Sequence, residues 1–217
     1  MIVKKQALIC DLDMTLIDSG QDIAASLTYV LNRFGTHKVT VDEVLPYVGK
    51  GIQNLFDRFM PDLTVGSPRH LELMKVYQGH YKEHCADATK VFPGVRETLE
   101  KLNALGIPVA VASNKWGVIS QHVCERLGID RFFSHFQGTE KMPGKPRPDV
   151  ILAACEAIGV SPENAIYVGD KVTDIVAAKR AACAVVSVTY GVDEKMVLER
   201  ESPDAIIDRF QEVLKFF

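Results

Sequence analysis

Residues 6–18, QALICDLDMTLID, contain the pattern that decides the fold. Residues 6–10 form an apolar run, which ends abruptly in an acidic cluster comprising Asp11, Asp13 and Asp18. A short apolar run bounded in this way predicts a buried strand with carboxylates at its C-terminal end. We therefore expect the first strand of a sheet to end at a functional site.

After Pro93 the sequence alternates between strand and helix patterns. Apolar runs predict strands at 107–113, 132–136, 165–169 and 184–188, and amphipathic stretches predict helices at 94–105, 116–127, 149–158 and 172–181, followed by a last strand and helix within 204–216. Buried strands that alternate with helices are typical of a parallel sheet with helices on both faces. The expected fold class is therefore α/β, with a doubly wound, Rossmann-like parallel sheet.

Between the first strand and this alternating region the pattern is helical. Apolar residues recur at helical spacing over about 22–60, with Phe34 among them, and again over 67–84. The pattern is interrupted by Pro46, Gly49, Gly51 and Pro61. This segment predicts a smaller, all-helical cap domain inserted after the first strand. The expected boundaries are 1–17 and 88–217 for the α/β core and 18–87 for the helical cap.

Composition and charge narrow the class of protein. The chain of 217 residues has a formal net charge of −3, without the basic excess of a nucleic-acid-binding protein, so we expect no nucleic-acid partner. No apolar run approaches the roughly 18 residues that span a bilayer, and the N-terminal residues lack the pattern of a signal peptide. We therefore expect a cytoplasmic protein without a membrane partner. The five cysteines are scattered and are expected to be reduced structural thiols.

Polar side chains follow several of the predicted strands. In a doubly wound sheet, ligands bind outside the carboxyl ends of the strands, so these side chains are expected to lie together. Carboxylates suit Mg²⁺, which shares its coordination with a substrate phosphate, whereas hydroxyls, an amide and a lysine suit phosphoryl oxygens. The residues concerned are Asp11, Asp13, Thr15, Ser113, Asn114, Lys145, Asp170 and Asp174.

The spacing of the carboxylates permits distinct roles. Of Asp11 and Asp13, one can attack a phosphoryl group once a metal and a lysine neutralise the charge that it approaches. The other can act as general acid toward the leaving oxygen and then as general base toward water. Asp170 and Asp174 lie four residues apart at the start of a predicted helix, where both could reach one metal ion, although such residues are as often only helix caps.

Together these clusters resemble the signature of the haloacid dehalogenase-like hydrolase superfamily. Its DxDxT, Ser/Thr, lysine and GDxxxD motifs are similar to DLDMTLIDS at 11–19, VASNK at 111–115, PGKPRPD at 143–149 and YVGDKVTD at 167–174. The predicted cap, with YVGKGIQNLF at 47–56, is similar to that of the phosphoglycolate phosphatase-like members. The resemblance implies an α/β core, a helical cap and a phosphatase activity.

The resemblance also implies a role for each motif residue. It makes Asp11 the nucleophile and Asp13 the general acid and base, and it assigns the phosphoryl group to Ser113 and Lys145. Magnesium is expected on Asp11, Asp13 through its backbone carbonyl, and Asp170, with Asp174 as a further ligand or a support. Thr15 and Asn114 are expected among the phosphate contacts because of their side-chain chemistry.

Three residues depart from the pattern of the family. Met14 stands where Gly is usual, Lys171 where a small hydroxyl residue is common, and Lys50 where the cap segment often has Asn. Lys50 is the cap residue that we expect to contact the distal group of the substrate, although a surface lysine is an equally good interpretation. Trp116, early in a predicted helix, is expected to pack beneath that helix.

These features predict a magnesium-dependent phosphatase that hydrolyses a small phosphorylated metabolite, first of all 2-phosphoglycolate, through an aspartyl-phosphate. One alternative is a sugar phosphomutase or phosphotransferase, but these tend to carry Glu where this chain has Gly169. The other is a non-catalytic phospholigand-binding protein, whose expected signature is the loss of Asp11, Asp13 or Lys145. The protein is expected to be a monomer or a homodimer.

Overall fold

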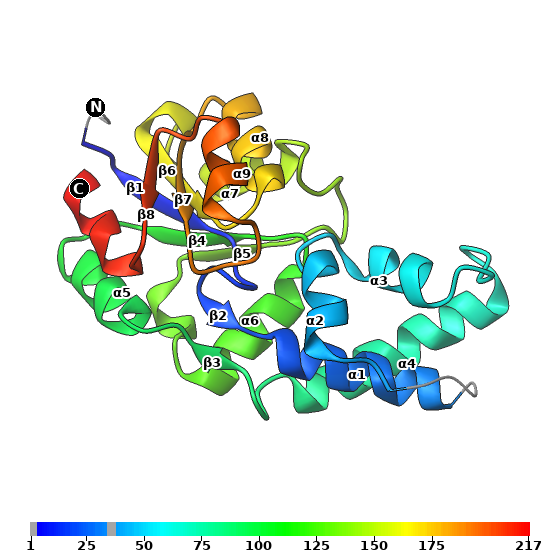
Figure 1. Cartoon of the computed structure of the whole chain (residues 1–217). Helices are drawn as coiled ribbons and strands as arrows, with labels where there is room; N and C mark the ends of the chain where they lie inside the picture. Colours follow the sequence, from blue (N-terminus) through cyan, green and yellow to red (C-terminus); the bar gives the residue numbers. More distant parts are fainter. Residues whose placement is uncertain (1–3, 34–37) are drawn as a thin grey trace.

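The core of the computed structural model, which describes residues 4–33 and 38–217, is one six-stranded parallel sheet (Figure 1). Its strand order is β5-β4-β1-β6-β7-β8, so the chain winds outward from β1 in both directions. The predicted doubly wound α/β fold is confirmed. The strands are β1 (Ala7–Cys10), β4 (Val109–Ala112), β5 (His135–Gln137), β6 (Ala165–Gly169), β7 (Ala184–Val188) and β8 (Ala205–Ile207).

The central strand β1 is buried on both faces. Leu8 and Cys10 belong to one hydrophobic cluster, whereas Ala7 and Ile9 belong to another, because successive side chains of a strand point to opposite faces. The first cluster includes side chains of α5 (Val95–Ala104) and α6 (Gly117–Leu127). The second includes side chains of α7 (Asp149–Ala157), α8 (Val172–Arg180) and α9 (Lys195–Arg200). Helices therefore cover both faces of the sheet (Figure 1).

Two predicted elements differ from the structure in type or position. The strand expected at 132–136 is preceded by a 3₁₀ turn, Asp130–Phe132, which buries the Phe132 side chain, and β5 begins only at His135. The last helix, Phe210–Phe216, is a 3₁₀ helix whose Phe210 and Val213 side chains are buried. Short 3₁₀ segments of this kind are common as connectors between elements.

The segment after β1 forms helices that lie beyond one end of the sheet (Figure 1). They are α1 (Gly20–Asn32), α2 (Val41–Val44), the 3₁₀ turn η1 (Leu45–Tyr47), α3 (Ile52–Phe59) and α4 (Pro68–His84). Over 22–60 the helices are interrupted at Gly49 and Gly51, as the sequence predicts, and the φ angles of these residues are 78° and 86°. Glycine adopts such angles without the steric cost that other residues incur. Phe34, expected among the apolar residues of the first helix, lies outside the described residues.

A short antiparallel ribbon joins the helical segment to the core. β2 (Ile17–Asp18) pairs with β3 (Lys90–Val91), two strands that the sequence analysis did not predict. The buried carboxylate of Asp22 accepts hydrogen bonds from the backbone N–H groups of Ala88 and Thr89 and from the Thr89 hydroxyl. These contacts hold the two connections side by side. The domain boundary expected at 17/18 falls within β2 and the one at 87/88 just before β3, and both stay a prediction.

In the part of the chain that the structure describes, no helix combines the length and the hydropathy that crossing a bilayer requires.

Candidate active site

The carboxyl ends of three neighbouring strands deliver polar residues to one place. Asp11 follows β1, Ser113 follows β4 and Asp170 follows β6, and both β4 and β6 pair with β1. Cys10 lies opposite Val168 in the register, so the chain leaves β1 and β6 at nearly the same level. The sheet therefore brings the first and fourth motifs together, as the sequence predicts.

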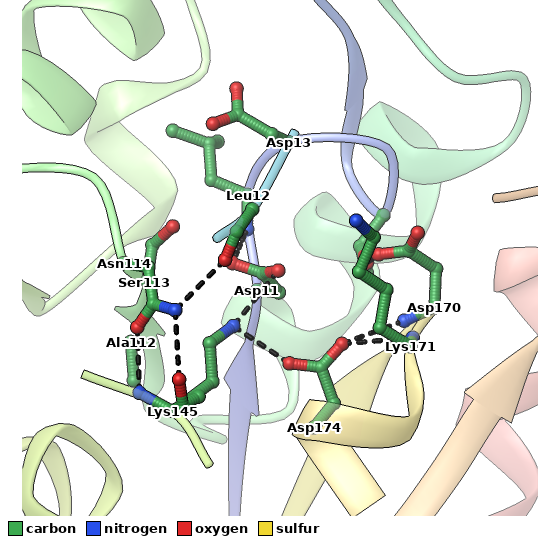
Figure 2. Close-up of polar contacts among 12 residues, drawn as sticks. Asp11, Leu12, Asp13, Ala112, Ser113, Asn114, Lys145, Asp170, Lys171 and Asp174 are labelled. Carbon is green, nitrogen blue, oxygen red and sulfur yellow. Dashed lines mark hydrogen bonds and ion pairs between the residues drawn. The ribbon is translucent and has the colours of Figure 1, made fainter. Parts of the chain in front are cut away.

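Lys145 lies at the centre of this group. Its ammonium Nζ is 2.8 Å from Asp11 Oδ2 and 2.7 Å from Asp174 Oδ1 (Figure 2). It also donates a 2.8 Å hydrogen bond to the Tyr167 hydroxyl. Only 1% of the Lys145 side chain is exposed. Burial alone would lower the pKa of Lys145, but the charges of Asp11 and Asp174 outweigh it and raise that pKa. Lys145 is therefore a charged ammonium.

Three buried carboxylates face one another beside Lys145. Asp11, Asp170 and Asp174 each offer an oxygen within 4.8 Å of the others. Asp170 accepts hydrogen bonds from the Thr15 hydroxyl at 2.9 Å and from the Val192 N–H at 2.8 Å. Burial, followed by the charges of Asp174 and Asp11, raises the pKa of Asp170 to about 8. Three hard oxygen donors with a single ammonium between them fit a divalent cation such as Mg²⁺.

The Asp13 carboxylate lies apart from that group. It accepts a 2.7 Å hydrogen bond from the Ser19 hydroxyl and pairs with the Lys115 ammonium at 3.0 Å. Figure 2 shows it pointing away from Asp11 and Asp174. The structure therefore does not bring the Asp13 side chain to the predicted metal site, which leaves its backbone carbonyl as the group that could reach an ion.

Met14 shapes the turn that separates the two aspartates. Its φ angle is 64°, in the left-handed region, and its N–H donates a 2.7 Å hydrogen bond to the Ile17 carbonyl. Glycine would take this conformation without strain, whereas a residue with a Cβ incurs about 1–2 kcal/mol. The departure from the family pattern at this position therefore leaves the tight turn intact at an energetic cost.

Asn114 holds three parts of the site together. Its side-chain NH₂ donates to the carbonyls of Gly49 and Lys145, and its oxygen accepts the Lys145 N–H at 2.7 Å. The buried Ser113 hydroxyl accepts the N–H of Lys115 at 3.3 Å. Asn114, like Thr15, is therefore engaged with protein groups in this structure, and the phosphate contacts predicted for both stay a prediction.

The cap turn at residues 48–51 covers the nucleophile candidate. The Lys171 ammonium donates to the Val48 carbonyl, and burial lowers the pKa of Lys171. A Cβ built on Gly49 would lie 3.9 Å from Asp11 Oδ2, so the backbone of this turn closely approaches the carboxylate. Lys171, the second departure from the family pattern, thus ties the cap to the core.

Lys50 lies on the exposed side of the same turn. Its ammonium is 5.5 Å from the centroid of the Tyr47 ring, and its side chain is solvent-exposed. In this conformation Lys50 is therefore not positioned for the substrate contact that the sequence predicts.

A cavity of about 240 Å³ lies between the cap and the core loops. Trp116, 38% exposed, lines it, so the expectation that this side chain packs beneath its helix is wrong. The sequence analysis also missed Ser19 and Lys115 as partners of Asp13, although Lys115 directly follows the Ser113-Asn114 motif. The lining residues include Asp13, Ile23, Tyr47, Ile52, Gln53, Leu55, Tyr77, Gln78, Tyr81, Lys115, Trp116 and Ile119.

Comparison with known proteins identifies the relatives of the chain. Residues 8–188 match the model of the haloacid dehalogenase-like hydrolase family. The chain is 33% identical to the phosphoglycolate phosphatase of Haemophilus influenzae, over 94% of each chain, and 34% identical to that of Neisseria meningitidis, over 96% of this chain and 92% of the relative. The crystal structure of a predicted phosphoglycolate phosphatase from Haemophilus somnus superposes with a TM-score of 0.87 at 30% identity, over 97% of each chain. The resemblance deduced from the sequence motifs is confirmed, and the chain belongs to the haloacid dehalogenase-like hydrolase family.

Proposed function

We propose that this protein is a magnesium-dependent phosphatase that hydrolyses a small phosphomonoester through an aspartyl-phosphate on Asp11. The observation that carries the proposal is the buried Asp11 carboxylate, paired with Lys145 at 2.8 Å beside Asp170 and Asp174. The names of the relatives support 2-phosphoglycolate as the first substrate to test.

Asp11, Asp170 and the backbone carbonyl of Asp13 would hold the metal ion, with Asp174 as a further ligand or as a support. Bound magnesium would neutralise the charge between the Asp11 carboxylate and the phosphoryl oxygens. Asp174 accepts the backbone N–H groups of Asp170 and Lys171 at 3.1 and 3.0 Å, which fixes its carboxylate at the start of α8.

Asp11, Asp13 and Lys145 have distinct roles in the two chemical steps. An Asp11 oxygen attacks phosphorus, the bond to the ester oxygen breaks, and Asp13 gives its proton to the leaving alkoxide. Asp13 then takes a proton from the water that attacks the aspartyl-phosphate, which releases phosphate and restores Asp11. Lys145 stabilises the charge that develops on the phosphoryl oxygens. Before the first step Asp13 must turn from Ser19 and Lys115 toward Asp11 and bind, from solvent or from the phosphate group of the substrate, the proton that it then donates.

The cap turn supports hydrolysis in a sheltered site. The backbone around Gly49 lies directly over Asp11 and is held there by Asn114 and Lys171. A cap closed in this way excludes bulk water while the ester bond breaks. Opening of the cap would then release the products.

The alternative functions have less support. A Cβ built on Gly169 would overlap the Asp174 carboxylate, so the Glu found at this position in phosphomutases does not fit the present arrangement. A non-catalytic phospholigand-binding protein is disfavoured because Asp11, Asp13 and Lys145 are all present.

Phosphate release from a panel of small phosphomonoesters, with Mg²⁺ and with EDTA, tests the proposal. We expect turnover with Mg²⁺, with 2-phosphoglycolate among the best substrates, and its loss on metal removal. Binding of a phosphorylated ligand without any phosphate release would contradict hydrolysis. Transfer of the phosphoryl group to an added sugar hydroxyl, in preference to water, would instead establish a phosphotransferase.

We also expect Mg²⁺ to stabilise the protein more strongly as pH rises. Burial and the neighbouring charges raise the pKa of Asp170 in the metal-free fold well above the usual value of an aspartate, so the fold favours a proton there. Because the folded state binds this proton more tightly than the unfolded state, the metal-free protein loses stability as pH rises from about 4 to 8. The melting temperature of the metal-free protein should therefore fall as pH rises from 6.5 to 8.

Thermal melts in Mg²⁺ and in EDTA across this pH range measure the effect. The stabilisation by Mg²⁺ should grow with pH in the wild type. The variant Asp170→Asn cannot titrate at this position, so its difference between Mg²⁺ and EDTA should be small and independent of pH. A wild-type difference that shrinks with rising pH would contradict a metal bound at these carboxylates.

A further inference from the structure

Lys115 connects the general acid and base candidate to the cap. Its ammonium is 3.0 Å from Asp13 Oδ2, donates a 2.8 Å hydrogen bond to the Tyr81 hydroxyl, and lies 4.3 Å from the centroid of the Tyr81 ring. Only 12% of the Lys115 side chain is exposed. Tyr81 belongs to α4 of the cap, so one ammonium joins the core, the cap and Asp13.

The cavity between cap and core contains a balanced pair of charges. Among the described residues that line it, Lys115 is the only cation and Asp13 the only anion. Lys50, the other cation of the cap turn, is exposed and is not one of these lining residues. A leaving group that enters this cavity therefore meets one ammonium, and that ammonium already has a carboxylate partner.

Proton transfer requires Asp13 to leave that partner. In the present arrangement the Asp13 carboxylate points away from Asp11 (Figure 2), and both of its oxygens are engaged, by Ser19 and by Lys115. Turning it toward Asp11 strips a mostly buried ammonium of its anion, which is unfavourable unless another anion takes its place. A neutral leaving group supplies no such anion, whereas a leaving group that carries a carboxylate does.

We propose that Lys115 binds a carboxylate on the leaving group of the substrate, and that this exchange of partners releases Asp13 for proton transfer. The inference rests on the proposed phosphatase function and specifies its substrate class: phosphomonoesters of small hydroxy acids. A cavity of about 240 Å³ accommodates such a leaving group. Because Lys115 exchanges Asp13 for the carboxylate of the substrate, that carboxylate is needed for catalysis as well as for binding.

The test compares 2-phosphoglycolate with ethyl phosphate, which has the same chain length but no carboxylate. The wild type should prefer 2-phosphoglycolate in kcat/KM. Lys115→Met should lower kcat/KM for 2-phosphoglycolate by about 10–100-fold, the range expected for loss of a hydrogen-bonded charge. For ethyl phosphate, kcat of this variant should stay the same or rise, because Asp13 no longer has to break an ion pair with residue 115 before it transfers a proton.

Three further variants make the test specific. Lys115→Arg keeps the charge and should retain part of the preference for 2-phosphoglycolate. Lys50→Met removes the rival cation and should keep that preference. Lys141→Met, on an exposed loop residue, is the control for removing a lysine. For wild-type protein, glycolate should inhibit at a concentration at least about tenfold lower than glycolamide, a comparison that needs no variant.

The outcomes separate this inference from the proposed function. If Lys115→Met lowers kcat/KM equally for both substrates, Lys115 has a structural role and the inference is overturned. Loss of the preference for 2-phosphoglycolate in Lys50→Met would also overturn it. A wild type without preference for the carboxylate, or equal inhibition by glycolate and glycolamide, would also overturn it while leaving the phosphatase proposal standing. Absence of phosphate release from every phosphomonoester would instead overturn the phosphatase proposal itself.

Discussion

Replacing Asp11 by Asn should lower kcat by at least about 10⁴-fold, the scale on which removal of a nucleophile acts. The amide keeps the shape of the carboxylate but has no charge with which to attack phosphorus. Asp11 is 1% exposed and lies directly after β1, so an isosteric replacement should leave the sheet intact. Phosphate release and a rapid-quench assay for acyl-phosphate, detected by hydroxylamine, measure the two consequences together.

Asp18→Asn is the matched control, because Asp18 belongs to the same motif but is exposed on β2. It should keep turnover within about threefold of the wild type, as expected for a surface substitution. An acyl-phosphate that persists in Asp11→Asn, or turnover above about 1% of the wild type, would exclude Asp11 as the nucleophile.

The sheet and the positions of its polar residues were predictable because they depend on local patterns. The apolar residues 7–10 are buried on both faces, as a central parallel strand requires, and Asp11 directly follows them. Parallel strands place their carboxyl ends at one edge, so Asp170 and Ser113 could be assigned to the same site without knowledge of the cap.

The surroundings of Asp13 were not predictable in this way. Its partners Ser19 and Lys115 follow β2 and β4, and which side chains pair with Asp13 depends on the exact course of these loops after the strands end. The contact of Lys171 with Val48 likewise joins segments more than 120 residues apart in the chain. Periodicity in the sequence carries no information about such contacts, which explains why Lys50 was singled out and Lys115 was not.

Replacing Lys145 by Met should separate catalysis from stability. Activity should fall by about 10³-fold or more, because the phosphoryl oxygens and Asp11 lose the ammonium that stabilises their charge. The metal-free protein should lose about 3–5 kcal/mol of stability, since Asp11 and Asp174 remain buried without their partner. Mg²⁺ should restore much of the stability but not the activity, because it replaces the charge of Lys145 among the carboxylates and not its contact with the phosphoryl group.

Thermal melts and phosphate release, each with Mg²⁺ and with EDTA, distinguish these effects. Lys141→Met changes an exposed lysine of the same loop and should match the wild type in both assays. If Mg²⁺ fails to raise the melting temperature of Lys145→Met, the carboxylates of Asp11, Asp170 and Asp174 do not form the metal site. If the variant keeps its activity, the ammonium has only a structural role. Loss of activity together with recovery of stability would mean that one buried cation keeps the acidic cluster folded and also binds the phosphate.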